Sequence, residues 1–402
     1  MMSGVFTRLV GQHAVEAELL AAARAARGDA DHNDGGAGTM THAWLITGPP
    51  GSGRSVAALC FAAALQCTSD EDPGCGMCRA CTTTMAGTHA DVRRVIPEGL
   101  SIGVDDMRAI VQIASRKPTT GRHQIVVVED ADRLTEGAAN ALLKVVEEPP
   151  PSTVFLLCAP SVDPEDIAIT LRSRCRHVAL VTPSTPSIAQ VLIDGDGLDA
   201  KTANWAASVS GGHVGRARRL ATDSDARQRR EQALALVRDA VTPSRAYAAA
   251  EELVAAAEAE AVALTADRAE TETEELRTAL GAGGTGKGTA GTMRGAAGAI
   301  KDLERRQKSR QTRASRDALD RALIDLATYF RDALLVASNA GEVQANHPDM
   351  ADRVASLAAH AAPERLLRCI EAVLQCREAL ATNVKPKFAV DAMVATIGQE
   401  LR

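Results

Sequence analysis

The stretch that decides the fold reads Gly48-Pro49-Pro50-Gly51-Ser52-Gly53-Arg54-Ser55. It follows the apolar run 42–47, which has the composition of a strand, and precedes the Ala-rich run 55–66, which has the composition of a helix. Between a strand and a helix, a glycine-rich loop of this kind can hold phosphate oxygens with its backbone N–H groups. The loop matches the pattern G-x-x-x-x-G-K-[ST] at every position but one, where Arg54 replaces the lysine. The stretch therefore predicts an α/β domain built around a phosphate-binding loop.

Two departures affect the chemistry of this loop. A lysine ammonium is a compact charge that fits between two phosphates, whereas the planar guanidinium of Arg54 cannot take the same place. Glu129 and Asp130 follow the apolar run 125–128, where ATPases with such a loop carry an Asp that holds Mg²⁺ and often a Glu that polarises water. Here the order is inverted: Glu129 can still reach a metal, but Asp130 is one methylene too short for the second task. We expect either a loop that serves the fold without nucleotide, or nucleotide binding with poor or no hydrolysis; the residues concerned are Gly48, Gly51, Gly53, Arg54, Ser55, Glu129 and Asp130.

Outward from the loop, short apolar runs alternate with helical periods as far as residue 181, which is typical of a parallel α/β sheet. Two further helices are expected, at 104–114 and from the cap Thr135 to Glu147, where three prolines stop the helix. Further strands are expected at 92–96, 124–128, 153–158 and 177–181.

Strand signals end after Pro183, and only helical periods follow. Three short helices are expected near 188–192, 200–209 and 214–220, and long helices beyond residue 226, with the glycine-rich segment 281–298 as a loop between two of them. The sequence therefore predicts three domains, with boundaries at 1–181 for the sheet, 182–225 for a small helical part and 226–402 for an all-helical part.

Composition excludes several classes of protein. The 402 residues include 46% apolar and 24% charged residues, as in a folded globular chain. A formal net charge of −6 disfavours a protein that binds nucleic acid by bulk attraction, and 2% aromatic residues leave few side chains for base stacking. No run of about 18 apolar residues predicts a membrane span, and the first residues lack a signal-peptide pattern. We therefore expect a cytoplasmic protein with no membrane partner.

Four cysteines form a separate motif. Cys67-x7-Cys75-x2-Cys78-x2-Cys81 has two overlapping C-x-x-C steps and one thiol upstream. Four thiolates at this spacing can close a tetrahedral Zn²⁺ site, and Gly74 and Gly76 let the backbone bend around it. Free buried cysteines or a redox pair are the alternatives, but a redox pair does not need four thiols. We expect a structural Zn²⁺ site in residues 67–81.

Four features together carry a family resemblance. They are Val10-Gly11-Gln12, the cysteine motif behind the phosphate-loop helix, the segment Ala138-Ala139-Asn140-Ala141-Leu142-Leu143-Lys144-Val145-Val146-Glu147-Glu148-Pro149-Pro150, and Ser173-Arg174-Cys175. Over about residues 5 to 220 the chain resembles the AAA+ clamp-loader family of bacterial DNA polymerase III. The resemblance implies an α/β AAA+ domain with an inserted zinc module, then a small helical lid, then an all-helical collar that joins subunits.

Within that family the resemblance leaves two roles. The altered Arg54 and the inverted Glu129-Asp130 favour the delta-prime branch, whose own nucleotide site is degraded, so that the isolated chain is not an enzyme. The alternative is the ATP-hydrolysing tau/gamma motor branch. The family's partners are then the tau/gamma and delta subunits, the sliding clamp and primer–template DNA, in a replication complex at the nucleoid.

The resemblance also gives Arg174 a role. In the family this arginine, with Ser173 and Cys175 beside it, reaches the ATP and Mg²⁺ of the neighbouring motor as an arginine finger. From the sequence alone, without the resemblance, Arg174 is better explained as a surface residue at the start of a strand, or as the partner of Asp163 or Glu165 in an ion pair.

A basic stretch marks the helical part. Its cations are mixed with Asp302 and Glu304, which favours a solvated helix face; a contact with DNA is the alternative. The cations are Lys301, Arg305, Arg306, Lys308, Arg310, Arg313 and Arg316.

Overall fold

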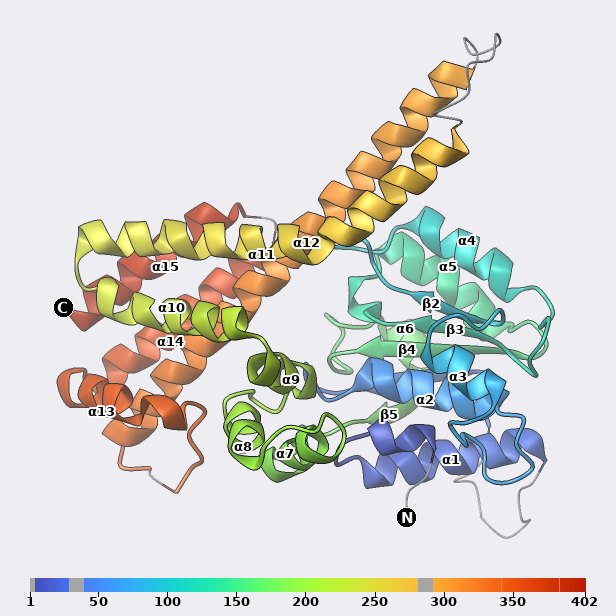
Figure 1. Cartoon of the computed structure of the whole chain (residues 1–402), viewed down its shortest axis with the longest axis horizontal. Coiled ribbons are helices and arrows are strands. Elements are labelled where there is room, and N and C mark those ends of the chain that lie inside the picture. The colour runs from blue at the N-terminus through green and yellow to red at the C-terminus, as the bar shows by residue number, and fades with distance from the viewer. Residues whose placement is uncertain (1–3, 29–39, 281–291, 341, 383) are drawn as a thin grey trace. The chain divides into compact units, whose positions relative to one another are not determined.

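The computed structural model describes residues 4–28, 40–280, 292–340, 342–382 and 384–402, without the side chains of 292–296. Two compact units, Met1–Ala221 and Thr222–Arg402, make up the chain (Figure 1). Among the described helices, none has the length and apolar character needed to cross a bilayer.

A five-stranded parallel sheet forms the centre of the first unit, with the strand order β2-β3-β4-β1-β5. Each strand lies within two residues of a predicted run, so the predicted α/β sheet is confirmed. The strands are Ala43–Thr47 (β1), Val92–Val95 (β2), Gln124–Val128 (β3), Thr153–Ala159 (β4) and Arg176–Ala179 (β5).

Helices cover both faces of this sheet (Figure 1). Side chains of β1 alternate between the faces: Trp44 packs on one side with Phe61, at 4.9 Å between ring centroids, and Leu45 packs on the other with Leu142. Because both faces are covered, β1, β3 and β4 are buried along their whole length, as expected of inner parallel strands. The covering helices are His13–Arg27 (α1) and Arg54–Gln66 (α2) on the first face, and Val104–Ala114 (α4) and Glu136–Glu147 (α5) on the second.

Shorter helices complete the first unit. The three helices predicted after Pro183 are confirmed, and the side chains of Ser184 and Asp199 cap the first two by accepting backbone N–H groups. The elements are Val5–Arg8 (η1), Arg79–Met85 (α3), Ala131–Arg133 (η2), Ile169–Arg172 (α6), Thr185–Asp194 (α7), Ala200–Ser208 (α8) and Val214–Thr222 (α9).

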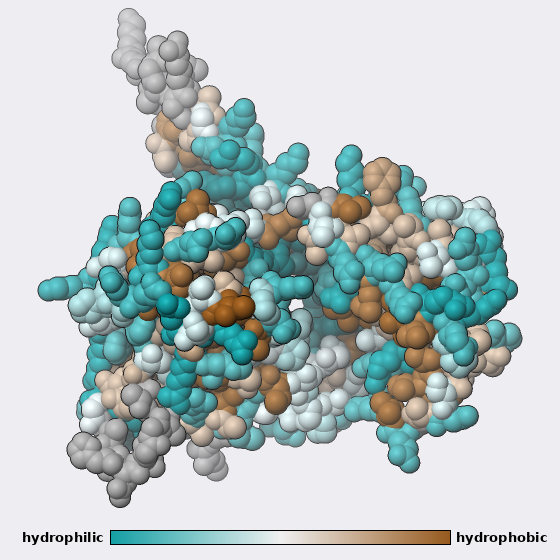
Figure 2. Space-filling view, turned by 180° about the vertical axis from the view of Figure 1, so that it is seen from behind, coloured by the Kyte–Doolittle hydropathy of each residue, from teal (hydrophilic) through white to brown (hydrophobic). Residues whose placement is uncertain are grey.

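The second unit is a bundle of helices, as predicted. One apolar cluster fills it, with Phe330 and Leu366 fully buried. On the face in Figure 2 the bundle shows hydrophobic residues among hydrophilic ones, and its exposed large apolar side chains include Leu367, Leu374 and Phe388. The elements are Ser224–Asp239 (α10), Pro243–Ala279 (α11), Thr292–Ala337 (α12), Pro348–Met350 (η3), Ala351–His360 (α13), Pro363–Ala381 (α14) and Pro386–Leu401 (α15).

Helices α11 and α12 pair as a long hairpin that projects from the bundle (Figure 1). The prediction of a loop over 281–298 is wrong at its end, since α12 begins at Thr292; residues 281–291 lie outside the described part of the chain. Part of the basic stretch also faces the partner helix rather than water: both η nitrogens of Arg310 donate to Glu272 of α11, at 3.0 and 2.9 Å. Lys301, Arg306 and Lys308 are exposed, as expected of a solvated face.

Asp91 fastens the start of β2 to the loop before β3. Its carboxylate is buried and accepts the backbone N–H groups of Thr119, Thr120 and Gly121 at 2.6, 2.7 and 2.6 Å. Burial alone raises the pKa of such a group, but these N–H donors outweigh it and lower the pKa of Asp91 to about 2.

We expect Asp91→Asn to lower the free energy of unfolding of the first unit by about 1–3 kcal/mol at neutral pH, because buried N–H donors lose an ionised acceptor. The folded pKa lies below the ordinary value, so the stabilisation is present above about pH 4 and is lost as the pH falls towards 2. Urea unfolding at pH 7 and pH 3, followed by tryptophan fluorescence, measures this, since both tryptophans, Trp44 and Trp205, lie in the first unit.

Asp352→Asn, at an exposed position in α13, is the control and should leave both curves unchanged. An equal loss of stability at both pH values for Asp91→Asn would contradict the assigned role of the ionised carboxylate.

Candidate functional site

The predicted phosphate loop lies between β1 and α2. Gly51 and Gly53 have φ angles of 85° and 98°, in the left-handed region that favours glycine, and α2 begins immediately afterwards at Arg54. The loop is tied to the end of β4 by a hydrogen bond from Gly48 N–H to the carbonyl of Pro160, at 3.2 Å. The loop thus has the strand–turn–helix context that phosphate binding requires.

Two side chains, those of Arg54 and His213, lie against this loop. Nη1 of Arg54 donates to the carbonyl oxygen of Gly48 at 2.9 Å, so the guanidinium bends back over its own loop. The His213 ring lies against Gly51: a Cβ placed on that glycine would come within 2.3 Å of His213 Cγ. His213 precedes α9, so the small helical part contributes a ring to the wall of the site.

At the end of β3, Glu129 is not free to serve a metal. Its Oε1 accepts from Nε of Arg94 at 2.7 Å and lies 2.6 Å from Arg94 Nη2. Arg94 lies on the neighbouring strand β2, where it pairs in register with Val127, the residue before the end of β3. A metal bound by Glu129, as expected from the sequence, would therefore have to compete with Arg94 for the Glu129 carboxylate.

Asp132 is a further carboxylate at this edge. Its Oδ1 is buried without a hydrogen-bond partner among the described residues. Burial, and then the like charge of Asp130, raise the pKa of Asp132, while Arg54 acts in the opposite direction. Asp132 is thus a buried carboxylate that the neighbouring cations, Arg133 and Arg54, compensate only in part.

The segment Val10-Gly11-Gln12 leads into the same region. The buried Gln12 side chain bonds both backbone groups of Val181: its Nε2 donates to the carbonyl at 2.6 Å, and its Oε1 accepts from the N–H at 3.1 Å. The same Nε2 lies 3.5 Å from the carbonyl of Ser52 in the phosphate loop. Gln12 thus links that loop to the segment leading into α7.

Arg174 lies apart from the phosphate loop, in the turn between α6 and β5. Its Nη1 donates to the carbonyl of Thr170 at 3.0 Å and to Ser173 Oγ at 3.1 Å, and its Nη2 lies 2.7 Å from Oε1 of Glu147. The alternative pairing with Asp163 or Glu165 is wrong, since the carboxylate beside Arg174 comes from the end of α5. The side chain keeps 40% of its surface exposed, while Cys175 next to it packs against the core.

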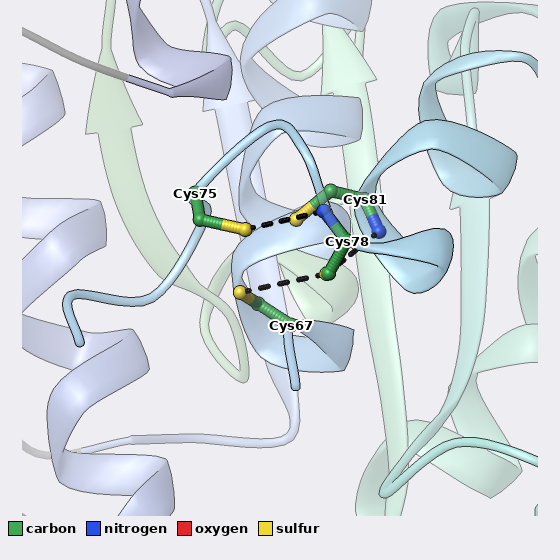
Figure 3. Close-up of side chains that lie close together, drawn as sticks. All are labelled: Cys67, Cys75, Cys78 and Cys81. Carbon is green, nitrogen blue, oxygen red and sulfur yellow. Dashed lines mark hydrogen bonds between the residues drawn. The ribbon is translucent and has the colours of Figure 1, made fainter. Parts of the chain in front are cut away.

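The four predicted cysteines converge in one cluster (Figure 3). Their sulfur atoms all lie within 4.8 Å of one another, and Sγ of Cys67 and Cys78 are 3.8 Å apart. Four sulfurs at about 2.3 Å from a tetrahedral Zn²⁺ lie roughly 3.8 Å from each other. The cluster could therefore hold a metal such as zinc.

Local structure positions these thiols. Cys67 is the residue directly after α2, and Cys78 caps α3 by accepting the N–H of Cys81. The loop between Cys67 and Cys78 turns at Gly74 and Gly76, which have φ angles of 89° and 77°. Burial raises the pKa of a thiol, but N–H groups of Thr68 and Cys81 lower the pKa of Cys78 to about 6. A thiol that ionises readily is a good metal ligand.

Two residues of the N-terminal segment, Arg27 and Val5, hold the cysteine loop by hydrogen bonds to its backbone carbonyls. The η nitrogens of Arg27, at the end of α1, donate to the carbonyls of Cys67, Ser69 and Glu71, each at 2.9 Å. The N–H of Val5 donates to the carbonyl of Gly74 at 2.8 Å. Cys60, Cys158, Cys369 and Cys376 are also buried, and they are not members of this cluster.

Sequence reasoning missed His213, Arg94 and Glu147. Arg94 carries a weak signal, because it is a charged residue within an otherwise apolar-ended strand at the edge of the sheet. The sequence gives no sign that His213 reaches Gly51, since the two are brought together only by the fold. Glu147 was seen as the end of a helix and not as the neighbour of Arg174.

Comparison with known proteins identifies two parts of the chain. Residues 32–184 match the family model for DNA polymerase III, delta subunit, and residues 314–387 match the model for DNA polymerase III, delta subunit, C terminal. A solved structure of a DNA polymerase III gamma subunit-related protein from Thermotoga maritima is 16% identical and covers 96% of this chain and 100% of that one, with a TM-score of 0.42.

Curated relatives agree with the family models. The DNA polymerase III subunit delta' of Escherichia coli K12 is 39% identical over 150 residues, 37% of this chain and 44% of that protein. That of Pseudomonas aeruginosa is 38% identical, over 37% of this chain and 46% of that protein. The gamma/tau subunit of Mycobacterium tuberculosis H37Rv is 32% identical, over 43% of this chain and 28% of that protein. The chain spans less than half the length of these relatives. It belongs to the DNA polymerase III clamp-loader family, in which it resembles the delta-prime subunits.

Proposed function

We propose that this chain is a non-motor, delta-prime-type subunit of the bacterial DNA polymerase III clamp loader. A contrast between charged groups supports the proposal. Arg54 bonds within its own phosphate loop and Glu129 is paired with Arg94, whereas Arg174 keeps exposed surface. A chain of this kind does not hydrolyse ATP alone; it offers a cation to another subunit.

In this role Arg174 completes the ATP site of a neighbouring tau/gamma motor subunit. Its guanidinium stabilises the charge that develops on the transferring phosphoryl group, while ATP and Mg²⁺ belong to the motor. Ser173 holds the side chain by its hydroxyl, and Cys175 anchors the turn in the core.

The remaining parts have matching roles in the proposal. Residues 1–181 are the AAA+ domain, 182–225 the lid and 226–402 the collar, whose exposed apolar side chains suit packing against other subunits. The assembly includes the delta subunit and loads the sliding clamp on primer–template DNA in the cytoplasm, at the nucleoid.

A second function rests on the gamma/tau relatives, which match 43% of this chain. In that reading the chain is itself an ATP-hydrolysing motor, with Arg54 in the place of lysine. The isolated chain distinguishes the two: a motor turns over ATP and a delta-prime-type subunit does not.

We expect Arg174→Ala to fold normally and to lower ATP turnover at the completed site by on the order of 10³-fold, since that is the lower range for arginine fingers. Steady-state ATPase of the reconstituted complex, with and without primed DNA, measures the change. Arg172→Ala, which removes a nearby exposed arginine, is the control.

Unchanged ATP turnover by the complex with Arg174→Ala would contradict the role of Arg174 as an arginine finger. Brisk hydrolysis by the isolated wild-type chain would favour the motor function instead.

We propose further that the cysteine cluster holds a structural Zn²⁺. All four ligands come from the chain, so no coordination position is left for a substrate. The metal fixes the loop that contacts Arg27 and Val5, and its loss frees that loop.

Cys78→Ser should release zinc and expose residues 68–77 to protease, with little direct effect on ATP turnover by the complex. Elemental analysis of the dialysed chain and limited proteolysis measure these effects. Cys369→Ser, at a buried thiol outside the cluster, should retain the metal. A wild-type chain that holds no zinc would end the site assignment.

A further inference from the structure

The ion pair between Arg174 and Glu147 joins two segments that carry the family resemblance. Glu147 is the last residue of α5, and Arg174 lies after α6. Their Oε1 and Nη2 atoms are 2.7 Å apart, and both side chains are about two fifths exposed, at 41% and 40%. An ion pair this exposed adds little to stability.

Helix electrostatics also argue against a passive Glu147. The C-terminal end of a helix carries partial negative charge, so a carboxylate there is unfavourable. Glu147 occupies that position in α5, and Pro149 and Pro150 fix where the helix ends. The guanidinium of Arg174 is the cation that offsets the charge.

The contacts of Arg174 leave part of its guanidinium available. Thr170 and Ser173 accept from Nη1, and Glu147 approaches Nη2. The Nε–H has no partner among the described residues and, with Nη2, forms the edge of the guanidinium that can bind an anion side-on. Nη2 already lies 2.7 Å from Glu147, so an anion bound on this edge would share Nη2 with the Glu147 carboxylate.

We infer that Glu147 is a positioning residue for the arginine finger: it orients the Arg174 guanidinium towards the phosphates bound by the neighbouring motor. The inference rests on the proposed function of Arg174. An arginine side chain loses rotamer entropy when it is fixed, and a guanidinium that is already held loses less on reaching its target.

The test uses the reconstituted clamp-loader complex with ATP. Glu147→Ala should lower kcat by about 10-fold, and by no more than the roughly 100-fold that a misplacement of about 1 Å produces. The KM for ATP should not change, because the motor binds the nucleotide. Glu147→Gln, which keeps an acceptor oxygen, should retain more activity than Glu147→Ala.

Two further variants make the result specific. Glu148→Gln changes the adjacent exposed carboxylate, which has no ion pair among the described residues, and should behave as wild type. In an Arg174→Ala background, Glu147→Ala should have no further effect, because it acts through Arg174. Thermal unfolding of each isolated chain checks that the variants fold.

Three results would overturn the inference: unchanged or increased kcat with Glu147→Ala, an equal loss in the Arg174→Ala background, or the same loss with Glu148→Gln. If Arg174→Ala itself leaves turnover unchanged, the proposed function fails as well. If Arg174→Ala lowers turnover and Glu147→Ala does not, only the positioning role fails.

Discussion

Burial of the parallel sheet on both faces is the constraint on which the first unit depends. Because all five strands run the same way, their carboxyl ends meet along one edge. The phosphate loop after β1, Glu129 after β3 and Pro160 after β4 therefore come together there, as the bond between Gly48 and Pro160 shows. Groups that lie up to 112 residues apart in the chain thus form one site (residues 48 to 160).

The same edge explains why the local chemistry differs so much from the motif. Arg94 pairs with Glu129 and Arg54 bends back to the carbonyl of Gly48, while Asp132 keeps a raised pKa because it is buried near Asp130. Cations that already have partners within the chain are less available to an anionic ligand. Arg174 also has partners in Thr170, Ser173 and Glu147, but its side chain stays 40% exposed.

Much of the fold follows from local signals in the sequence. Inner strands carry apolar runs such as 125–128 because helices cover both sides, and the caps Thr135, Ser184 and Asp199 mark helix starts. The start of α12 was missed because glycines near residue 295 read as a loop, whereas the helix is set by pairing with α11. The cysteine site was predictable because its ligands are close in sequence; the Glu147–Arg174 pair and the His213–Gly51 contact were not, because they form only in the folded chain.

The hairpin of α11 and α12 is built differently from the bundle beneath it. The apolar cluster of the second unit includes Ala257 of α11 and Ala318 of α12, and further out the two helices meet through polar contacts such as Arg310 with Glu272 and Gln307 with Ala269. The C-terminal family match begins only at residue 314. An antiparallel pair of this kind can gain or lose whole helical turns at its tip while the bundle keeps its packing. Most of the hairpin lies before the C-terminal family match, so a shortened hairpin is a practical starting point for crystallisation of the bundle.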